Sequence, residues 1–156
     1  MALSPDELRR VASSMTILSR AFTLSRSHEK LLKDAGVRLD RAGSALLFKL
    51  RSHGESARVS DLAELLGVDT PAVTRKVQQL ERLGYVVIEP DAVDRRAKLV
   101  ALTKSGEKII ERIMLAVNHR LTRLFEGWTM DEVTNFSTSL EKFAHALTDE
   151  MENDRD

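Results

Sequence analysis

Apolar residues near both ends of the chain recur at alternating spacings of three and four. One stripe follows Ser4 and Glu7 and the other follows Thr129 and Glu132, two pairs that can form capping boxes at helix starts. Narrow stripes of this spacing are typical of helices that pair with another helix. We therefore expect a dimer contact through the stripe residues Leu8, Val11, Met15, Leu18, Val133, Phe136, Leu140, Phe143 and Leu147.

Up to the second stripe, the pattern predicts a series of helices. They are expected at residues 4–36, 41–52, 60–66, 70–83 and 103–125, with a short strand at 58–59. Ser60 and Thr70 are the expected N-caps of the third and fourth helices, Pro71 suits the first helical position, and Gly67 permits a tight turn between them. Leu83 is expected on the inward face of the fourth helix. These elements predict a mainly α fold containing a helix-turn-helix.

A β-hairpin is expected directly after the helix-turn-helix. Two β-rich runs, 85–89 and 98–102, flank the charged tip at 91–96. Arg95 and Arg96 at the tip of such a ribbon suit a minor groove and a phosphate, and Asp94 is close enough to brace an arginine. A charged turn can also be only a solvated turn.

The fourth helix presents polar side chains on the face opposite Val73, Val77 and Leu80. Arginine suits the guanine edge, glutamine suits adenine, and threonine can contact a thymine edge. The helix starts at Ser60 and Thr70 suit phosphates. Such a face can equally be a solvated helix surface, so alone it leaves both interpretations open. The candidate DNA-binding residues of this helix are Ala72, Thr74, Arg75, Gln78 and Gln79.

The charge of the chain changes this interpretation in two ways. The 24 basic and 24 acidic residues give zero net charge, which argues against a nucleic-acid binder and favours the alternative of a protein-binding scaffold. However, residues 70–104 contain seven basic and four acidic side chains, a net of +3, whereas residues 129–156 contain two basic and eight acidic ones, a net of −6. This distribution would orient the helix-turn-helix and hairpin towards phosphates.

Other classes of chemistry find little support in the sequence. The chain has no cysteine, and its four histidines lack ligand spacing, so we expect no disulfide, no metal and no cofactor. Neither a nucleophile elbow nor a Gly-rich phosphate loop is present, so we expect no enzyme. No secretory signal or long apolar run is visible, so we expect a soluble cytoplasmic protein that does not enter membranes.

The motifs of residues 59–106 together resemble the MarR family of bacterial transcription regulators. The resemblance rests on the runs Val59–Val68, Thr70–Arg75, Leu80–Val86, Asp91–Ala97 and Val100–Gly106. It implies a winged helix-turn-helix homodimer, often a repressor that a small, commonly aromatic or phenolic, ligand releases from DNA. By position, the helix at 70–83 would be the recognition helix, Arg96 the minor-groove arginine and Asp94 its brace. The sequence departs from the family pattern at Val93, where an arginine is common.

The resemblance also implies an organisation within one domain over residues 1–156. Residues 41–103 would form the winged helix-turn-helix lobe, and residues 1–36 and 104–156 would form the dimerisation helices. Two-fold symmetry would then place two recognition helices about 34 Å apart on a palindromic operator in double-stranded DNA. A small-molecule effector is expected in a cleft beneath the DNA-binding lobe, where the first, second and fifth helices converge, but the sequence identifies no residues for it.

Overall fold

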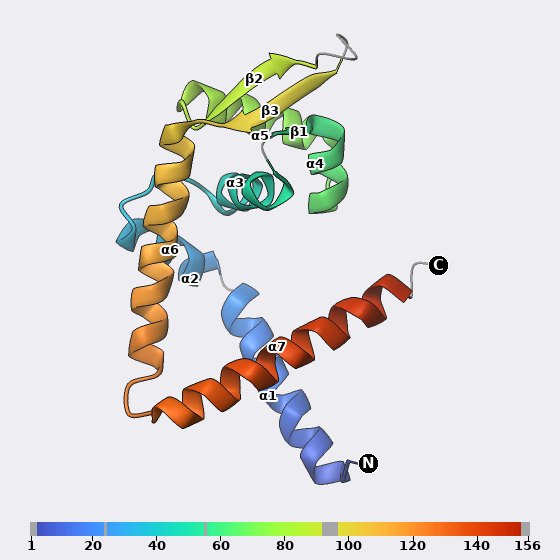
Figure 1. The fold of residues 1–156 in the computed structure, drawn as a ribbon, viewed down its shortest axis with the longest axis vertical. Helices are drawn as coiled ribbons and strands as arrows, with labels where there is room; N and C mark the ends of the chain where they lie inside the picture. Colours follow the sequence, from blue (N-terminus) through green and yellow to red (C-terminus); the bar gives the residue numbers. More distant parts are fainter. Residues whose placement is uncertain (1–2, 24, 55, 92–96, 154–156) are drawn as a thin grey trace. The chain divides into compact units, whose positions relative to one another are not determined.

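The computed structural model describes residues 3–23, 25–54, 56–91 and 97–153. The chain forms two compact units, residues 1–117 and 118–156. Figure 1 shows the elements in order: α1 (Pro5–Thr23), α2 (Ser25–Asp34), α3 (Arg41–His53), β1 (Ser56–Arg58), α4 (Val59–Leu66), α5 (Thr70–Arg82), β2 (Val86–Pro90), β3 (Lys98–Leu102), α6 (Lys104–Leu124) and α7 (Met130–Asn153). The mainly α fold with a small β-wing is confirmed.

The β-hairpin is part of a three-stranded antiparallel sheet with the order β1-β3-β2. Val86 pairs with Leu102 and Ile88 with Val100, so β2 and β3 lie side by side in Figure 1. β1 pairs along the other edge of β3, with Ala57 opposite Val100. The sheet and helices of the first unit enclose one core, whose fully buried members include Leu46, Leu47, Leu50, Leu62, Val77, Leu80, Val100, Ile110 and Ile113.

The first predicted helix is wrong in one respect, because residues 4–36 form two helices, α1 and α2, where one was expected. Thr23 is the last residue of α1, and Ser25 and Ser27 lie in the first turn of α2. β-Branched and short hydroxyl-bearing residues favour continuous helix less than alanine or leucine do, so this composition is compatible with a break. The capping box that starts α1 is confirmed, since the Glu7 N–H donates to Ser4 Oγ and the Ser4 N–H donates to Glu7 Oε2.

The end of α5 differs from the sequence prediction at Leu83. This residue is 44% exposed, whereas it was expected to face inward. The helix ends at Arg82, and the chain turns through Gly84, whose φ of 74° favours glycine. The Tyr85 N–H donates to the Leu80 carbonyl and closes the turn before Leu83 can complete the buried stripe.

The start of α6 is fixed against this same turn. Thr103, expected as the first residue of this helix, lies just before it; its Oγ1 donates to the Gly84 carbonyl at 2.6 Å and accepts from the Gly106 N–H at 3.1 Å, so Thr103 caps α6. A Cβ at position 106 would lie 2.1 Å from the Tyr85 carbonyl oxygen. Only glycine allows this close approach, which ties α6 to the base of the wing.

Candidate nucleic-acid interface

Helix α5 is held by a buried stripe and capped by a carboxylate. Val73, Val77 and Leu80 are all buried, as predicted. The N-cap is Asp69, whose Oδ1 accepts from the Ala72 N–H at 2.8 Å. The predicted cap at Thr70 is therefore wrong by one residue. Both residue types cap helices well, and the local pattern did not decide between the two neighbours.

The predicted cap at Ser60 is also wrong. Helix α4 begins at Val59 and its N-cap, Arg58, makes no side-chain cap hydrogen bond. Ser60 lies inside the first turn, where its hydroxyl donates to Asp61 Oδ1 at 3.0 Å. A carboxylate therefore lies in the first turn of α4 and another caps α5. Negative charge at a helix start favours the helix but opposes a phosphate there, so contacts by Ser60 and Thr70 with phosphates lose part of their rationale.

The predicted reading face of α5 contains both exposed and partly buried residues. Arg75, Gln78 and Gln79 are exposed, whereas Ala72 and Thr74 are half-buried. The Thr74 hydroxyl donates to the Thr70 carbonyl at 2.9 Å, so it presents acceptor lone pairs and a methyl group. The exposed face thus offers one guanidinium and two amides at positions three and four residues apart, which lie on neighbouring turns of a helix.

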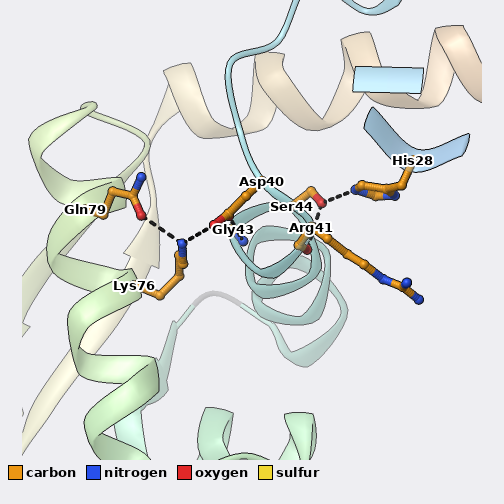
Figure 2. Close-up of polar contacts among 7 residues, drawn as sticks. All are labelled: His28, Asp40, Arg41, Gly43, Ser44, Lys76 and Gln79. Carbon is orange, nitrogen blue, oxygen red and sulfur yellow. Dashed lines mark hydrogen bonds and ion pairs between the residues drawn. The ribbon is translucent and has the colours of Figure 1, made fainter. Parts of the chain in front are cut away.

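Sequence reasoning missed a polar network that joins α5 to α3 (Figure 2). Lys76 Nζ donates to Asp40 Oδ2 at 2.5 Å and to Gln79 Oε1 at 2.8 Å. The other oxygen of Asp40 accepts from the Gly43 N–H at 2.8 Å and caps α3. An aspartate directly before the helix start at Arg41 was a local signal for this cap. The pairing of Asp40 with Lys76 spans 36 residues and has no such signal.

The Lys76 network lowers the pKa of the Asp40 carboxyl. Partial burial raises its pKa, but the hydrogen bonds from Lys76 and from the Gly43 N–H together outweigh burial and set the pKa below its ordinary value. Asp40 is therefore charged at neutral pH and can hold the Lys76 ammonium, whose side chain is only 18% exposed.

A second ion pair fixes the base of the wing. Asp91, predicted as the start of the exposed charged tip, is buried at 7% exposure. Its Oδ2 accepts from Arg58 Nε at 3.0 Å and Nη2 at 2.5 Å, and its N–H donates to the Ala97 carbonyl. Arg58 thus links β1 to Asp91, and Asp91 is in turn bonded to Ala97 on the other side of the hairpin. The other predicted wing residues, Asp94, Arg95 and Arg96, lie outside the described residues.

The predicted dimer residues lie on the exposed faces of α1 and α7. Val133 is half-buried, and the other eight are between 39% and 51% exposed. Phe136 also packs edge-to-face against Phe125 and Trp128, with ring centroids 5.9 and 5.6 Å apart. The capping box at the start of α7 is confirmed, because Glu132 Oε2 accepts from the Thr129 N–H at 2.8 Å. Each helix therefore presents apolar area to solvent within a single chain.

A groove of about 640 Å³ lies beside the reading face, between α3, the α4–α5 turn and α5. Its lining is largely apolar and comprises Arg41, Ala42, Ala45, Leu46, Leu66, Val68, Ala72, Val73, Arg75, Lys76 and Gln79. This position differs from the expected cleft among the first, second and fifth predicted helices. Within the described ranges, no cluster of histidines and carboxylates could hold a metal ion. None of the described helices combines the length and apolar character that a bilayer crossing requires.

The chain is similar to known proteins in sequence and in fold. Residues 39–97 match the model of the MarR family. A MarR family protein from Bacillus stearothermophilus superposes with a TM-score of 0.79 at 22% identity, over 94% of this chain and 99% of that one. The YusO protein from Bacillus subtilis gives 0.70 at 24% identity, over 92% and 99%. A mutant of MepR from S. aureus, bound to an oligodeoxyribonucleotide, gives 0.58 at 21% identity, over 94% and 99%.

Proposed function

From the match of residues 39–97 to the MarR family model, we propose that this chain is a winged helix-turn-helix protein of that family and acts as a bacterial, cytoplasmic transcriptional regulator that binds double-stranded DNA. We propose further that it acts as a homodimer on a palindromic operator and represses transcription until a small ligand binds.

The observation that carries DNA binding is the division of α5 into two faces. Val73, Val77 and Leu80 fix the helix in the core, and Arg75, Gln78 and Gln79 remain exposed on its outer side. Arginine and glutamine are the side chains that make bidentate contacts with base edges in a major groove. A relative of the same fold, MepR, has been captured on an oligodeoxyribonucleotide, which supports this use of the fold.

The exposed stripes of α1 and α7 support the homodimer. Apolar area of this kind is a marker of an interaction surface, and closed two-fold symmetry is the commonest way for identical chains to cover it. A two-fold dimer would read two half-sites in opposite orientations, so its operator would be palindromic.

The groove beside α5 supports control by a small molecule. A ligand lying against Ala72, Arg75 and Gln79 would occupy space beside the reading face and compete with DNA. Its mainly apolar lining suits an aromatic or phenolic compound, the class that the family resemblance implies. Ligand binding would thereby lower operator affinity and relieve repression.

Selection from a random library of DNA duplexes tests the proposal. The full-length protein is expected to enrich a palindromic sequence, and its affinity should fall steeply as salt rises, because bound phosphates release counterions. Removal of one phosphate contact should reduce the slope of log affinity against log salt by about one. If the protein enriches no specific DNA sequence, and salt does not change its weak binding to DNA, the alternative of a protein-binding scaffold is favoured.

A further inference from the structure

The Lys76–Gln79 contact constrains which edge of Gln79 can meet DNA. An ammonium group has three donors and no acceptor, so only the oxygen of the Gln79 amide can face Lys76 Nζ. The 2.8 Å contact is therefore with Oε1 on chemical grounds, whichever way the amide would turn by itself. Figure 2 shows the amide oxygen directed at Lys76 and the amide nitrogen directed away from it.

Lys76 is itself held from outside α5. Its ammonium lies between Gln79 and the Asp40 carboxylate, 2.5 Å from the latter. Asp40 in turn is fixed at the start of α3 through the Gly43 N–H. If Lys76 turned away from Gln79, it would have to leave an ion pair that is anchored on another helix. The network thus keeps one orientation of the Gln79 amide.

Adenine and guanine require different hydrogen-bonding groups from a glutamine side chain. In the major groove adenine presents an acceptor, N7, beside a donor, the N6 amino group, so a bidentate contact needs both the oxygen and the nitrogen of the amide. Guanine presents two acceptors, N7 and O6. The Gln79 oxygen has a second lone pair, but an adenine amino group using it would bring a second donor beside the ammonium.

We infer that Lys76 is a positioning residue that makes Gln79 present its amide N–H donors to DNA, so that Gln79 selects guanine over adenine. The inference rests on the proposed DNA-binding function and reverses the adenine preference expected of a free glutamine. Lys76 need not touch DNA for this effect, because it acts through the amide that it holds.

The test is selection from a random duplex library with the full-length chain and its variants, followed by sequencing. Gln79→Ala identifies the base pair that Gln79 reads, because preference at that position should flatten while the other positions stay unchanged. In the wild type we expect guanine there, preferred about tenfold over adenine, which corresponds to about 1.4 kcal/mol.

Substitutions at Lys76 then separate positioning from simple stability. Lys76→Met keeps an unbranched apolar stem but removes the ammonium donors, so adenine should rise at that position until it rivals guanine. Lys76→Arg restores a donor-only group and should restore the guanine preference. Asp40→Asn can still cap α3 but holds the ammonium less firmly, so it should give an intermediate preference. Unchanged preferences at the other positions show that each variant is folded.

Three results would overturn the inference, and they are distinguishable. If the wild type enriches no sequence, the proposed function fails and takes the inference with it. If a sequence is enriched but Gln79→Ala flattens no position, or flattens one that prefers adenine, DNA binding stands and the role of Gln79 is wrong. If Lys76→Met leaves the guanine preference unchanged, Lys76 does not position Gln79.

Discussion

Helices α5 and α7 both carry an apolar stripe at helical spacing, yet one buries it and the other does not. In α5, Val73, Val77 and Leu80 are almost inaccessible, and the exposed residues are polar. In α7, Leu140, Phe143 and Leu147 are at least 40% exposed. The apolar stripe of α5 is buried within its own chain, and its polar outer face is free to contact a ligand. The stripe of α7 leaves exposed apolar area that another protein surface could cover.

The comparison teaches that periodicity alone does not say where a stripe finds its partner. Both stripes predict an amphipathic helix, and both helices exist. What differs is the surrounding chain, since α5 lies among α3, α4 and β2, whereas Leu140, Phe143 and Leu147 of α7 are exposed. We therefore expect substitutions in the two stripes to change different properties, namely association for α7 and folding for α5.

The largest effect is expected for Phe143→Asp in α7. A central apolar contact contributes about 2 kcal/mol to an interface, and two-fold symmetry removes it twice, about 4 kcal/mol per dimer. The dimer dissociation constant should then rise about a thousandfold. Sedimentation at several protein concentrations measures this shift. Thr138→Asp, which puts the same charge on the opposite side of α7, should leave the dimer intact, and equal behaviour of the two variants would remove the stripe from the interface.

Leu80→Ala in α5 should reduce folding stability. Leu80 is fully buried, so the smaller side chain leaves a cavity, and the free energy of unfolding should fall by about 2–5 kcal/mol. Leu83→Ala is the matched control three residues away, where the same change at an exposed site should cost about 0.5 kcal/mol or less. Urea unfolding measures both. Similar losses at the two positions would contradict the boundary at which α5 ends.

Arg75→Ala tests the outer face of α5 and should leave folding unchanged. It removes one base-reading side chain, so operator binding should weaken by about 1–3 kcal/mol at constant salt. A fluorescence titration with the selected operator measures the loss. Arg9→Ala in α1 is the control, because it removes the same charge from an exposed helix outside the reading face. A loss as large for Arg9 would mean that total charge, rather than the α5 face, governs binding.

Local chemistry explains which parts of the fold the sequence predicts well. The capping boxes of Ser4 with Glu7 and of Thr129 with Glu132 join residues three apart, and both form as expected. The N-cap of α5 was harder to predict, because Asp69 and Thr70 are adjacent residues of suitable type and only Asp69 is the N-cap.

The contacts that position the candidate interface join residues far apart in the sequence. Asp40 with Lys76 and Arg58 with Asp91 join residues 36 and 33 positions apart. No periodicity or spacing marks such pairs, because they exist only once helices and strands are packed together. The outward residues Arg75 and Gln79 were therefore predictable, whereas the state of the Gln79 amide was not. Base preference depends on the orientation of the amide, so the sequence alone matched Gln78 or Gln79 to adenine without regard to it.

The smallest expected effect concerns the contact between α2 and α3 in the first unit. The Ser44 hydroxyl donates to the Arg41 carbonyl, so it must accept from His28 Nε2, 2.9 Å away (Figure 2). Partial burial lowers the pKa of His28 and the charge of Arg41 lowers it further, against a smaller opposing effect of Glu29. The folded pKa thus lies below the unfolded value of about 6.5. Neutral His28 therefore stabilises the folded state. This stabilisation is complete above pH 6.5 and is lost as the pH falls through the folded pKa of His28.

His28→Gln isolates this contribution, because the glutamine amide can donate to Ser44 Oγ but does not titrate. Urea unfolding at pH 8 and pH 5.5 should show a larger loss of stability on acidification for the wild type than for the variant. His53, His119 and His145 are present in both proteins, so their effects cancel in the difference. Equal losses for the two proteins would mean that protonation of His28 costs the folded state nothing.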